Sequence, residues 1–435
     1  MKKSVTLSLV IAFLLMLTLS SPTPTQATSS WNVQSVDEKA VLYSAGVSIA
    51  VDSSGNPHFC YTQSMNGSFL SPNSLVYTSW NGSGWDAQTV TPNSLINYNG
   101  LVIDTNDTPH IVFDSWNEEG EISLKYATWT GTNWSIQTID TGNLRWDSYA
   151  SIALDAADHP HVAYSGPHGE LKYAWWTGEY WNMQTIALAK SGFQYLALDS
   201  AGQPHIVYGY NPEDSAYSNL TVCYAYWNDK DSDWYLQTVV SNVNCSTFGN
   251  LVLDSADYPH FTSNVRPTIS TGNTSIMYNS WNGSAWASQY VGPARGAGND
   301  GAFLRLDSQG NPHIAYQKYT NTMDGLVYSL MYASRDDYEV WHLETAYSTK
   351  AMIMGTPTPF VLDQMNNPHI CFLKLRPTQG YYFDGTVMYA AGQPEQYSNP
   401  LLTAPVIVSA ALLVSIVVVG TAYLLKKRKA KEPLS

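Results

Sequence analysis

The chain has 435 residues, with 21 basic and 35 acidic residues and an isoelectric point of about 5.0. Residues 28–400 hold 14 of the basic and 34 of the acidic residues, a net charge of −20, which repels phosphate backbones and excludes nucleic acid as a partner. Charged residues and aromatic residues each make up 13% of the chain, a composition typical of an ordered body with a large core.

Both ends of the chain carry targeting patterns. Residues 1–27 are predicted to be a signal peptide, because two lysines precede an apolar run and a small-residue cleavage site ends at Ala27. Residues 401–425 carry no charge and are long enough for one transmembrane helix, and the basic residues of the tail, 426–435, predict that it is cytoplasmic. We therefore expect a single-pass cell-membrane protein with an extracellular body, residues 28–391, and a short linker, residues 392–400.

A repeat with a mean spacing near 52 residues fills the body. In each of seven copies, an Asp is followed five residues later by Pro-His. The repeated acids are Asp52, Asp104, Asp155, Asp199, Asp254, Asp307 and Asp363, and the repeated histidines are His58, His110, His161, His205, His260, His313 and His369. A feature present once in every copy is expected to build the copy, so we interpret these residues as structural.

Each copy predicts four short strands. The first strand ends at the Asp and the second begins at the His. The third residue after each Asp is always Gly, Asn or Asp, the residues that tolerate the left-handed backbone of a tight hairpin turn. A third strand carries a Tyr, and a fourth opens with Trp in six of the copies.

The seventh copy lacks a fourth strand, and an unattached one lies at the start of the mature chain. Residues 31–36 have the Trp-x-x-Gln pattern of a fourth strand but no copy before them. A last blade completed by both ends of the chain is how a circular β-propeller closes. We therefore predict an all-β fold, a seven-bladed propeller closed by an N-terminal strand, followed by one C-terminal transmembrane helix.

The repeat also resembles a known group. Leu-Asp-x-x-Gly-x-Pro-His, a Tyr-Ala strand and Asn-Gly-x-x-Trp together resemble the repeats of secreted microbial propeller proteins, grouped loosely with sialidase-like and fucose-lectin-like propellers. The resemblance implies architecture only, because the Ser-x-Asp-x-Gly-x-Thr-Trp box of the sialidases is absent from the sequence.

Candidate ligand-binding residues are those that depart from the repeat. Loops of variable length, between the second and third strands and between blades, share one face of a propeller, which is the usual place for a site. The candidates in these loops are Glu118, Glu119, Glu121, Arg145, Trp146, Asp147, Tyr210, Asp214, Arg295, Arg376, Tyr381, Tyr382 and Asp384. Aromatic faces with carboxylates suit sugars or a cationic peptide, whereas the simpler interpretation is a set of solvated loops.

Arg305 is the sharpest departure. It lies two residues before Asp307, where the other six copies have Ala or Val. A charge in an innermost, mostly apolar strand needs a partner or water. Arg305 is therefore predicted either to reach a ligand in the central channel or to form an internal ion pair.

The four cysteines suggest disulfides in an oxidising exterior. Cys60 and Cys371 occupy the same strand position in neighbouring blades, and Cys223 with Cys245 is the complementary pair, although three connectivities are possible. Eight Asn-x-Ser/Thr sequons would permit glycosylation.

The sequence favours a binding function. It shows no nucleophile motif, no metal-spaced cluster and no phosphate-binding loop, so no catalytic residue, metal or cofactor is predicted. The leading hypothesis is a surface-anchored recognition module for an extracellular glycan or protein. A carbohydrate-active enzyme, either a glycoside hydrolase or a lyase, and a structural component of the cell envelope are the alternatives.

Overall fold

The computed structural model describes residues 30–38, 46–64, 73–94, 96, 98–117, 119–142, 144, 149–190, 192–211, 220–240, 244–266, 274–294, 301–354, 358–377 and 383–393. Ser30–Gln393 form one compact unit. Among the described residues no helix is long and apolar enough to cross a membrane. The predicted signal peptide, transmembrane helix and cytoplasmic tail lie outside the described residues.

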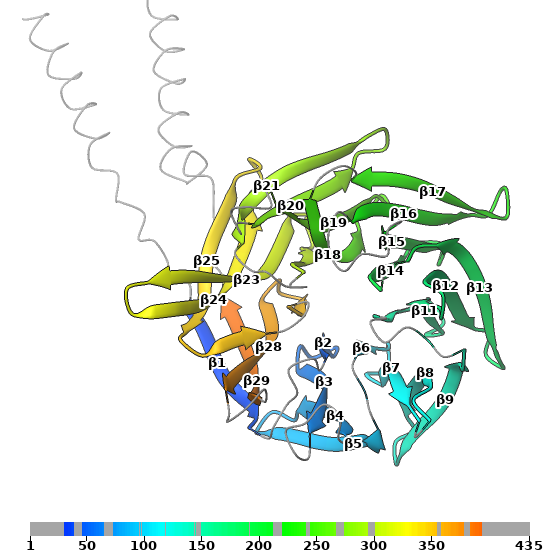
Figure 1. The fold of residues 1–435 in the computed structure, drawn as a ribbon, viewed down its shortest axis with the longest axis horizontal. Coiled ribbons are helices and arrows are strands. Elements are labelled where there is room, and N and C mark those ends of the chain that lie inside the picture. Colours follow the sequence, from blue (N-terminus) through cyan, green and yellow to red (C-terminus); the bar gives the residue numbers. More distant parts are fainter. Residues whose placement is uncertain are drawn as a thin grey trace, which may run out of the picture. The chain divides into compact units, whose positions relative to one another are not determined.

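Seven antiparallel sheets form the unit, and each sheet is one blade (Figure 1). Blade one contains β2 (Val47–Val51), β3 (Pro57–Ser64), β4 (Asn73–Trp80) and β5 (Trp85–Ser94). Blade two contains β6 (Asn99–Ile103), β7 (Pro109–Trp116), β8 (Ile122–Trp129) and β9 (Trp134–Asp140). Blade three contains β10 (Ser151–Leu154), β11 (Pro160–Ser165), β12 (Glu170–Trp176) and β13 (Trp181–Leu188). Blade four contains β14 (Gln194–Leu198), β15 (Pro204–Tyr210), β16 (Thr221–Asn228) and β17 (Asp233–Val240).

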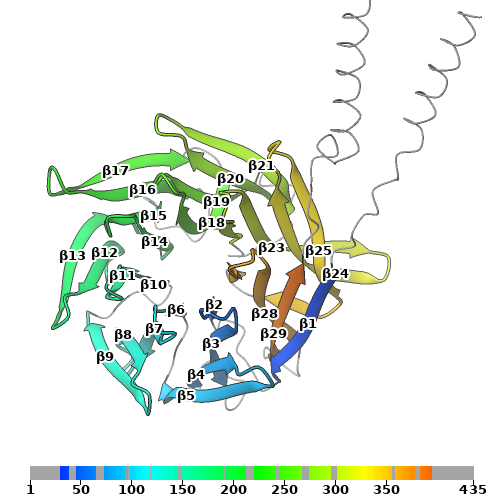
Figure 2. The ribbon, with the colours of Figure 1, turned by 180° about the vertical axis from the view of Figure 1, so that it is seen from behind.

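Blade five contains β18 (Asn244–Leu253), β19 (Pro259–Arg266), β20 (Thr274–Trp281) and β21 (Trp286–Ala294). Blade six contains β22 (Phe303–Leu306), β23 (Pro312–Thr322), β24 (Gly325–Arg335) and β25 (Trp341–Thr349). Blade seven contains β26 (Met352–Met354), β27 (Phe360–Leu362), β28 (Pro368–Pro377), β29 (Phe383–Gln393) and the N-terminal strand β1 (Ser30–Asp37). The first strands line the centre of the ring and the fourth strands form its outer edge (Figure 2).

The ring closes as the sequence predicts. β1 pairs with β29, from Ser30 opposite Gln393 to Asp37 opposite Val387, and supplies the outer strand of blade seven. The seven-bladed propeller is therefore confirmed. The first strand of this blade differs from the expectation, because two short strands, β26 and β27, both pair with β28. β29 also continues to Gln393, two residues beyond the predicted end of the body.

The two faces of the propeller can be assigned from the strand register. The turns after each repeated Asp lie on one face, here called the hairpin face, and the loops that enter the first strands lie on the opposite loop face. The third residue after each Asp has positive φ in all seven turns, between 60° and 87°. Gln393 and Ser30 lie beside His369 and Ala391, so both described ends of the propeller lie at the hairpin face.

A triad of Asp, His and Tyr fastens each turn to its blade. In blade one, Nδ1 of His58 lies 2.5 Å from the hydroxyl of Tyr77, and Nε2 lies 3.4 Å from Asp52. The equivalent Asp, His and Tyr form the same triad in all seven blades. Burial lowers the pKa of His58, so the neutral ring can accept from Tyr77 and donate towards Asp52.

Aromatic contacts join each blade to the next. The Trp that opens each fourth strand packs edge to face on the triad Tyr of the preceding blade, with ring centroids 5.2–5.8 Å apart. Trp31 of β1 makes this contact with Tyr332 of blade six, and Trp85 makes it with Tyr389 of blade seven. The same seven contacts therefore run around the closed ring.

The predicted disulfides are wrong, because all four cysteines are buried free thiols. Cys60 belongs to the core cluster between blades one and two, whereas Cys371 belongs to the cluster between blades seven and one. Cys223 and Cys245 likewise lie in different clusters. Packed sheets lie about 10 Å apart, whereas a disulfide needs Cα atoms within about 7 Å. Equivalent strand positions therefore point two sulfur atoms into separate cores.

Candidate binding site in the central channel

The first strands enclose a cavity of about 400 Å³ along the centre of the ring. Its lining starts at Gly46, Tyr98 and Tyr149, which precede first strands at the loop face, and continues along these strands to Ala197 and Leu253. Every blade contributes at least one lining residue. The cavity therefore lies on the propeller's central axis and begins at the face that carries the variable loops.

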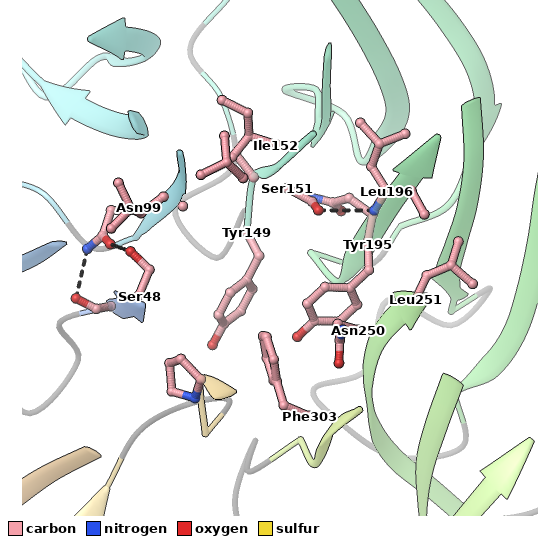
Figure 3. A pocket seen from close by; sticks show the side chains of 18 of the residues that line it. Ser48, Asn99, Tyr149, Ser151, Ile152, Tyr195, Leu196, Asn250, Leu251 and Phe303 are labelled. Carbon is pink, nitrogen blue, oxygen red and sulfur yellow. Dashed lines mark hydrogen bonds between the residues drawn. The ribbon is translucent and has the colours of Figure 1, made fainter. Parts of the chain in front are cut away.

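Aromatic side chains form an arc on one side of this cavity. Tyr98 and Tyr149 have ring centroids 3.9 Å apart, and Tyr149 stacks on Phe193 at 5.0 Å. Tyr195 lies 6.1 Å from Phe303, edge to face. The rings of Tyr149, Tyr195 and Phe303 project into the same space from blades three, four and six (Figure 3). They present apolar ring surface together with two tyrosine hydroxyl groups.

Polar side chains fasten neighbouring first strands to one another. The Ser48 hydroxyl donates to Asn99 over 2.6 Å, and the Ser151 hydroxyl accepts from the Leu196 amide over 3.0 Å (Figure 3). Asn250 accepts from the Leu304 amide and donates to its carbonyl, at 2.7 and 3.0 Å. These bonds connect first strands of neighbouring blades along the wall of the cavity.

Arg305 in β22 lines the cavity and is its only charged residue among the described lining residues. Its Nη1 donates to the Leu304 carbonyl over 2.9 Å, and the guanidinium carbon lies 5.7 Å from the centroid of the Phe303 ring. In the described part of the chain no carboxylate lies within ion-pair distance of it. Burial lowers the pKa of Arg305 to about 10, so the side chain is still cationic at neutral pH.

The opposite end of the channel is acidic. An open depression of about 350 Å³ on the hairpin face is lined by Asp52, Asp104, Asp107 and Asp363. Burial alone would raise the pKa of Asp52, but hydrogen bonds from Asn56, His58 and the Ser54 backbone outweigh it and lower the pKa. Hydrogen bonds have the same net effect on Asp104 and Asp363. The channel therefore has a cation inside it, near the end of β22 that leads into the hairpin turn, and an anionic rim at the hairpin face.

Three of the predicted loop candidates have described side chains, and none of these three lines the cavity. Glu119 and Glu121 are exposed in the turn after β7, where Asn117 bonds to both, and the exposed Tyr210 ends β15 outside the cavity lining. Arg376 and Asp384 face each other as Cα partners in the β28–β29 ladder, but their side chains lie outside the described part. Eight further candidates also lie outside it: Glu118, Arg145, Trp146, Asp147, Asp214, Arg295, Tyr381 and Tyr382.

The aromatic arc was missed by the sequence interpretation, although the repeat contains its signal. Six residues before the repeated Asp, blades two to five have Tyr98, Tyr149, Phe193 and Phe248, where the other blades have Gly or Pro. Four residues before it, only blades four and six have an aromatic residue, namely Tyr195 and Phe303. These are departures from the repeat of the same kind as Arg305.

Comparison with known proteins yields similarity of fold. No protein-family model matches the sequence, and no curated protein matches it. Similar solved structures include a lectin from Aleuria aurantia in complex with Fucα1-6GlcNAc, with 12% identity, a TM-score of 0.43 and coverage of 74% of this chain and 99% of that one. The mutant protein AofleA from Arthrobotrys oligospora has 12% identity and a TM-score of 0.46, over 73% of this chain and 90% of that one.

A leech intramolecular trans-sialidase is also similar, with 9% identity and a TM-score of 0.43 over 75% of this chain and 71% of that one. Solved structures similar to this propeller thus include fucose-binding lectins and sialidases. At these identities and TM-scores the likenesses assign neither a ligand nor a reaction to this chain. The Aleuria aurantia lectin has six blades, whereas the strand pairing of this chain defines seven.

Proposed function

We propose that this protein is a carbohydrate-recognition module at the cell surface, and that it binds a sugar in the channel cavity behind the loop face. The observation that carries the proposal is the convergence of Tyr149, Tyr195 and Phe303 on one cavity. Its volume of about 400 Å³ is within the range of about 300–1,000 Å³ that is usual for small-ligand sites.

The chemistry of the cavity supports a sugar ring as the ligand. Aromatic faces pack against the apolar C–H face of a pyranose, and hydroxyl groups at the edge of an aromatic arc can bond to sugar hydroxyls. The Tyr195 side chain is 8% exposed, and none of the hydrogen bonds resolved among the described residues uses its hydroxyl. This hydroxyl is therefore free to bond to a ligand.

Surface anchoring is the second part of the proposal, and it depends on the predicted signal peptide and membrane helix. Both described ends of the propeller, Ser30 and Gln393, lie at the hairpin face. The lining of the cavity begins at the opposite face, from which we propose that a ligand enters. A glycan on another molecule or cell could then reach it.

A glycan array tests the proposal. All seven sheets are complete within Ser30–Gln393, so residues 28–393 can be produced as a secreted propeller. We expect this propeller to bind a defined set of glycans, and Tyr149→Ala and Phe303→Ala to abolish that binding. Tyr180→Ala is the matched control, because Tyr180 is an exposed tyrosine in the turn between β12 and β13.

The controls also separate the alternative functions. Silence on the array, or binding that Tyr149→Ala and Phe303→Ala leave unchanged, would contradict the proposal. Product analysis on every glycan that binds tests the enzymatic alternative, since a lectin returns its ligand unaltered.

A further inference from the structure

We infer that the channel site selects sugars that carry a carboxylate, and that Arg305 binds this group. The inference rests on the proposed function and specifies the class of its ligand as acidic sugars. It is carried by Arg305, a cation that lies inside the propeller without an anionic partner among the described residues.

The fold does not need the cation of Arg305. Six of the seven blades place Ala or Val two residues before the repeated Asp and still form the turn and the triad. An enclosed cation without a counter-ion costs stability, whereas an apolar side chain would pack there at no such cost. Arg305 therefore has a role that packing of blade six does not explain.

The Arg305 side chain has hydrogen-bond donors that no described residue uses. A guanidinium group has five N–H donors, and only the one on Nη1 that donates to the Leu304 carbonyl is used among the described residues. The guanidinium carbon lies 5.7 Å from the centroid of the Phe303 ring, and Arg305 lines the cavity, so a ligand there can use the remaining donors. A carboxylate accepts two parallel bonds from such an edge, which is the strongest pairing open to it.

The charges around the cavity also favour an anionic ligand at Arg305. The other described lining residues are uncharged, so nothing in the cavity wall neutralises Arg305. The anionic rim at the hairpin face disfavours entry of an anion there. The net charge of −20 on residues 28–400 acts over longer distances, but physiological salt screens it beyond about 8 Å.

Size and aromatic lining favour an acidic monosaccharide unit over a bare anion. The cavity is far larger than a carboxylate alone requires. Tyr149, Tyr195 and Phe303 provide aromatic ring surface in the same cavity that Arg305 lines. A hexuronic acid combines both features, because its pyranose ring can pack on the arc while its carboxylate reaches Arg305.

The test uses two pairs of sugars that differ only at C6: methyl glucuronide against methyl glucoside, and methyl galacturonide against methyl galactoside. Calorimetric titration of the propeller, residues 28–393, at pH 7 should show a preference of roughly tenfold or more for at least one acid over its neutral partner, as charged hydrogen bonds provide. Arg305→Gln should abolish this preference and Arg305→Lys should retain part of it. Lys230→Gln, which removes an exposed charge between β16 and β17, should change nothing.

Each outcome is decisive. Equal or tighter binding of the neutral sugars, a preference that persists in Arg305→Gln, or no binding of either acid would overturn the inference. The array distinguishes this from failure of the proposed function, because neutral glycans bound through Tyr149 and Phe303 would leave that proposal standing. Thermal melting of Arg305→Gln checks folding, and its melting temperature should be no lower than that of the unaltered propeller.

Discussion

Replacing Arg305 by Met should stabilise the propeller. The pKa of Arg305 falls from 12.5 to about 10 on folding, because burial penalises the cation. A base whose pKa is lower in the folded state destabilises the fold wherever it is protonated in both states, which here means below about pH 10. At about 1.36 kcal/mol per pKa unit, the cationic side chain costs the fold about 3 kcal/mol at pH 7.

Two losses offset part of this gain. Arg305→Met removes the contact with the Phe303 ring, of about 1 kcal/mol, and the hydrogen bond to the Leu304 carbonyl, also about 1 kcal/mol. The net expectation is a free energy of unfolding that rises by about 1 kcal/mol at pH 7, and a melting temperature that rises by a few degrees at most.

Urea unfolding followed by tryptophan fluorescence measures the change. The midpoint should move to higher urea with an unchanged slope. Lys230→Met is the control, because an exposed charge should change the unfolding free energy by no more than about 0.5 kcal/mol. A loss of more than about 2 kcal/mol in Arg305→Met would refute the reasoning, since it would mean that Arg305 belongs to a stabilising ion pair.

Four further predictions concern the fold. Burial lowers the pKa of six of the seven triad histidines, so the stability they contribute is present above pH 6.5 and is lost as pH falls through their folded pKa. Calorimetry should therefore show the melting temperature falling from pH 7 to pH 5. A flat profile would contradict this. Gly249→Ala should lower the free energy of unfolding in urea by about 3 kcal/mol or more, because its Cβ would lie 1.7 Å from the Ala302 carbonyl oxygen. Gly84→Ala is the control and should be nearly neutral, since its Cβ would have nothing within 4 Å. Equal effects of the two substitutions would refute the packing argument. Deleting residues 28–37 exposes the edge of β29 and removes the contact of Trp31 with Tyr332. Size-exclusion chromatography of the purified protein should then show aggregates. A monodisperse, equally stable product would argue against ring closure by β1. A thiol reagent should detect no cysteine in the folded propeller and four after unfolding without reductant, whereas fewer than four would indicate a disulfide.

The architecture could be predicted because a repeat states the same structural requirement seven times. A residue with left-handed backbone is needed three positions after every Asp, and only Gly, Asn and Asp occur there. Ring closure followed from an unmatched Trp-x-x-Gln strand at the N-terminus. The division of the seventh first strand into β26 and β27 was not predicted, because it departs from the single first strand of the other six blades.

Contacts between blades were the part that spacing could not supply. Equal position in neighbouring blades suggested that Cys60 and Cys371 were partners, but equivalent positions point the same way around the ring and so enter successive cores. The aromatic contact of Trp85 with Tyr389 crosses a blade boundary for the same reason. Repetition thus predicts the blade, and the ring geometry decides what meets between blades.

The candidate site was predicted in part. Arg305 was identified because it breaks the repeat at an innermost position, and it lines the cavity. The charged loop residues were selected on the variability of loop length, and most of them lie outside the described residues, so their part in the site stays a prediction. The aromatic arc becomes visible only at two further positions of the repeat, six and four residues before the Asp, which hold Tyr149, Tyr195 and Phe303. An aromatic residue at these positions looks like ordinary core until the channel is known.

A crystal structure of the propeller with a bound sugar tests the central claim most directly, namely that carbohydrate binds in the channel. We predict electron density for a pyranose packed on Tyr149 and Phe303, with a carboxylate, where the sugar has one, at Arg305. A sugar found on the outer strands or on the hairpin face, with the channel empty, would contradict the account.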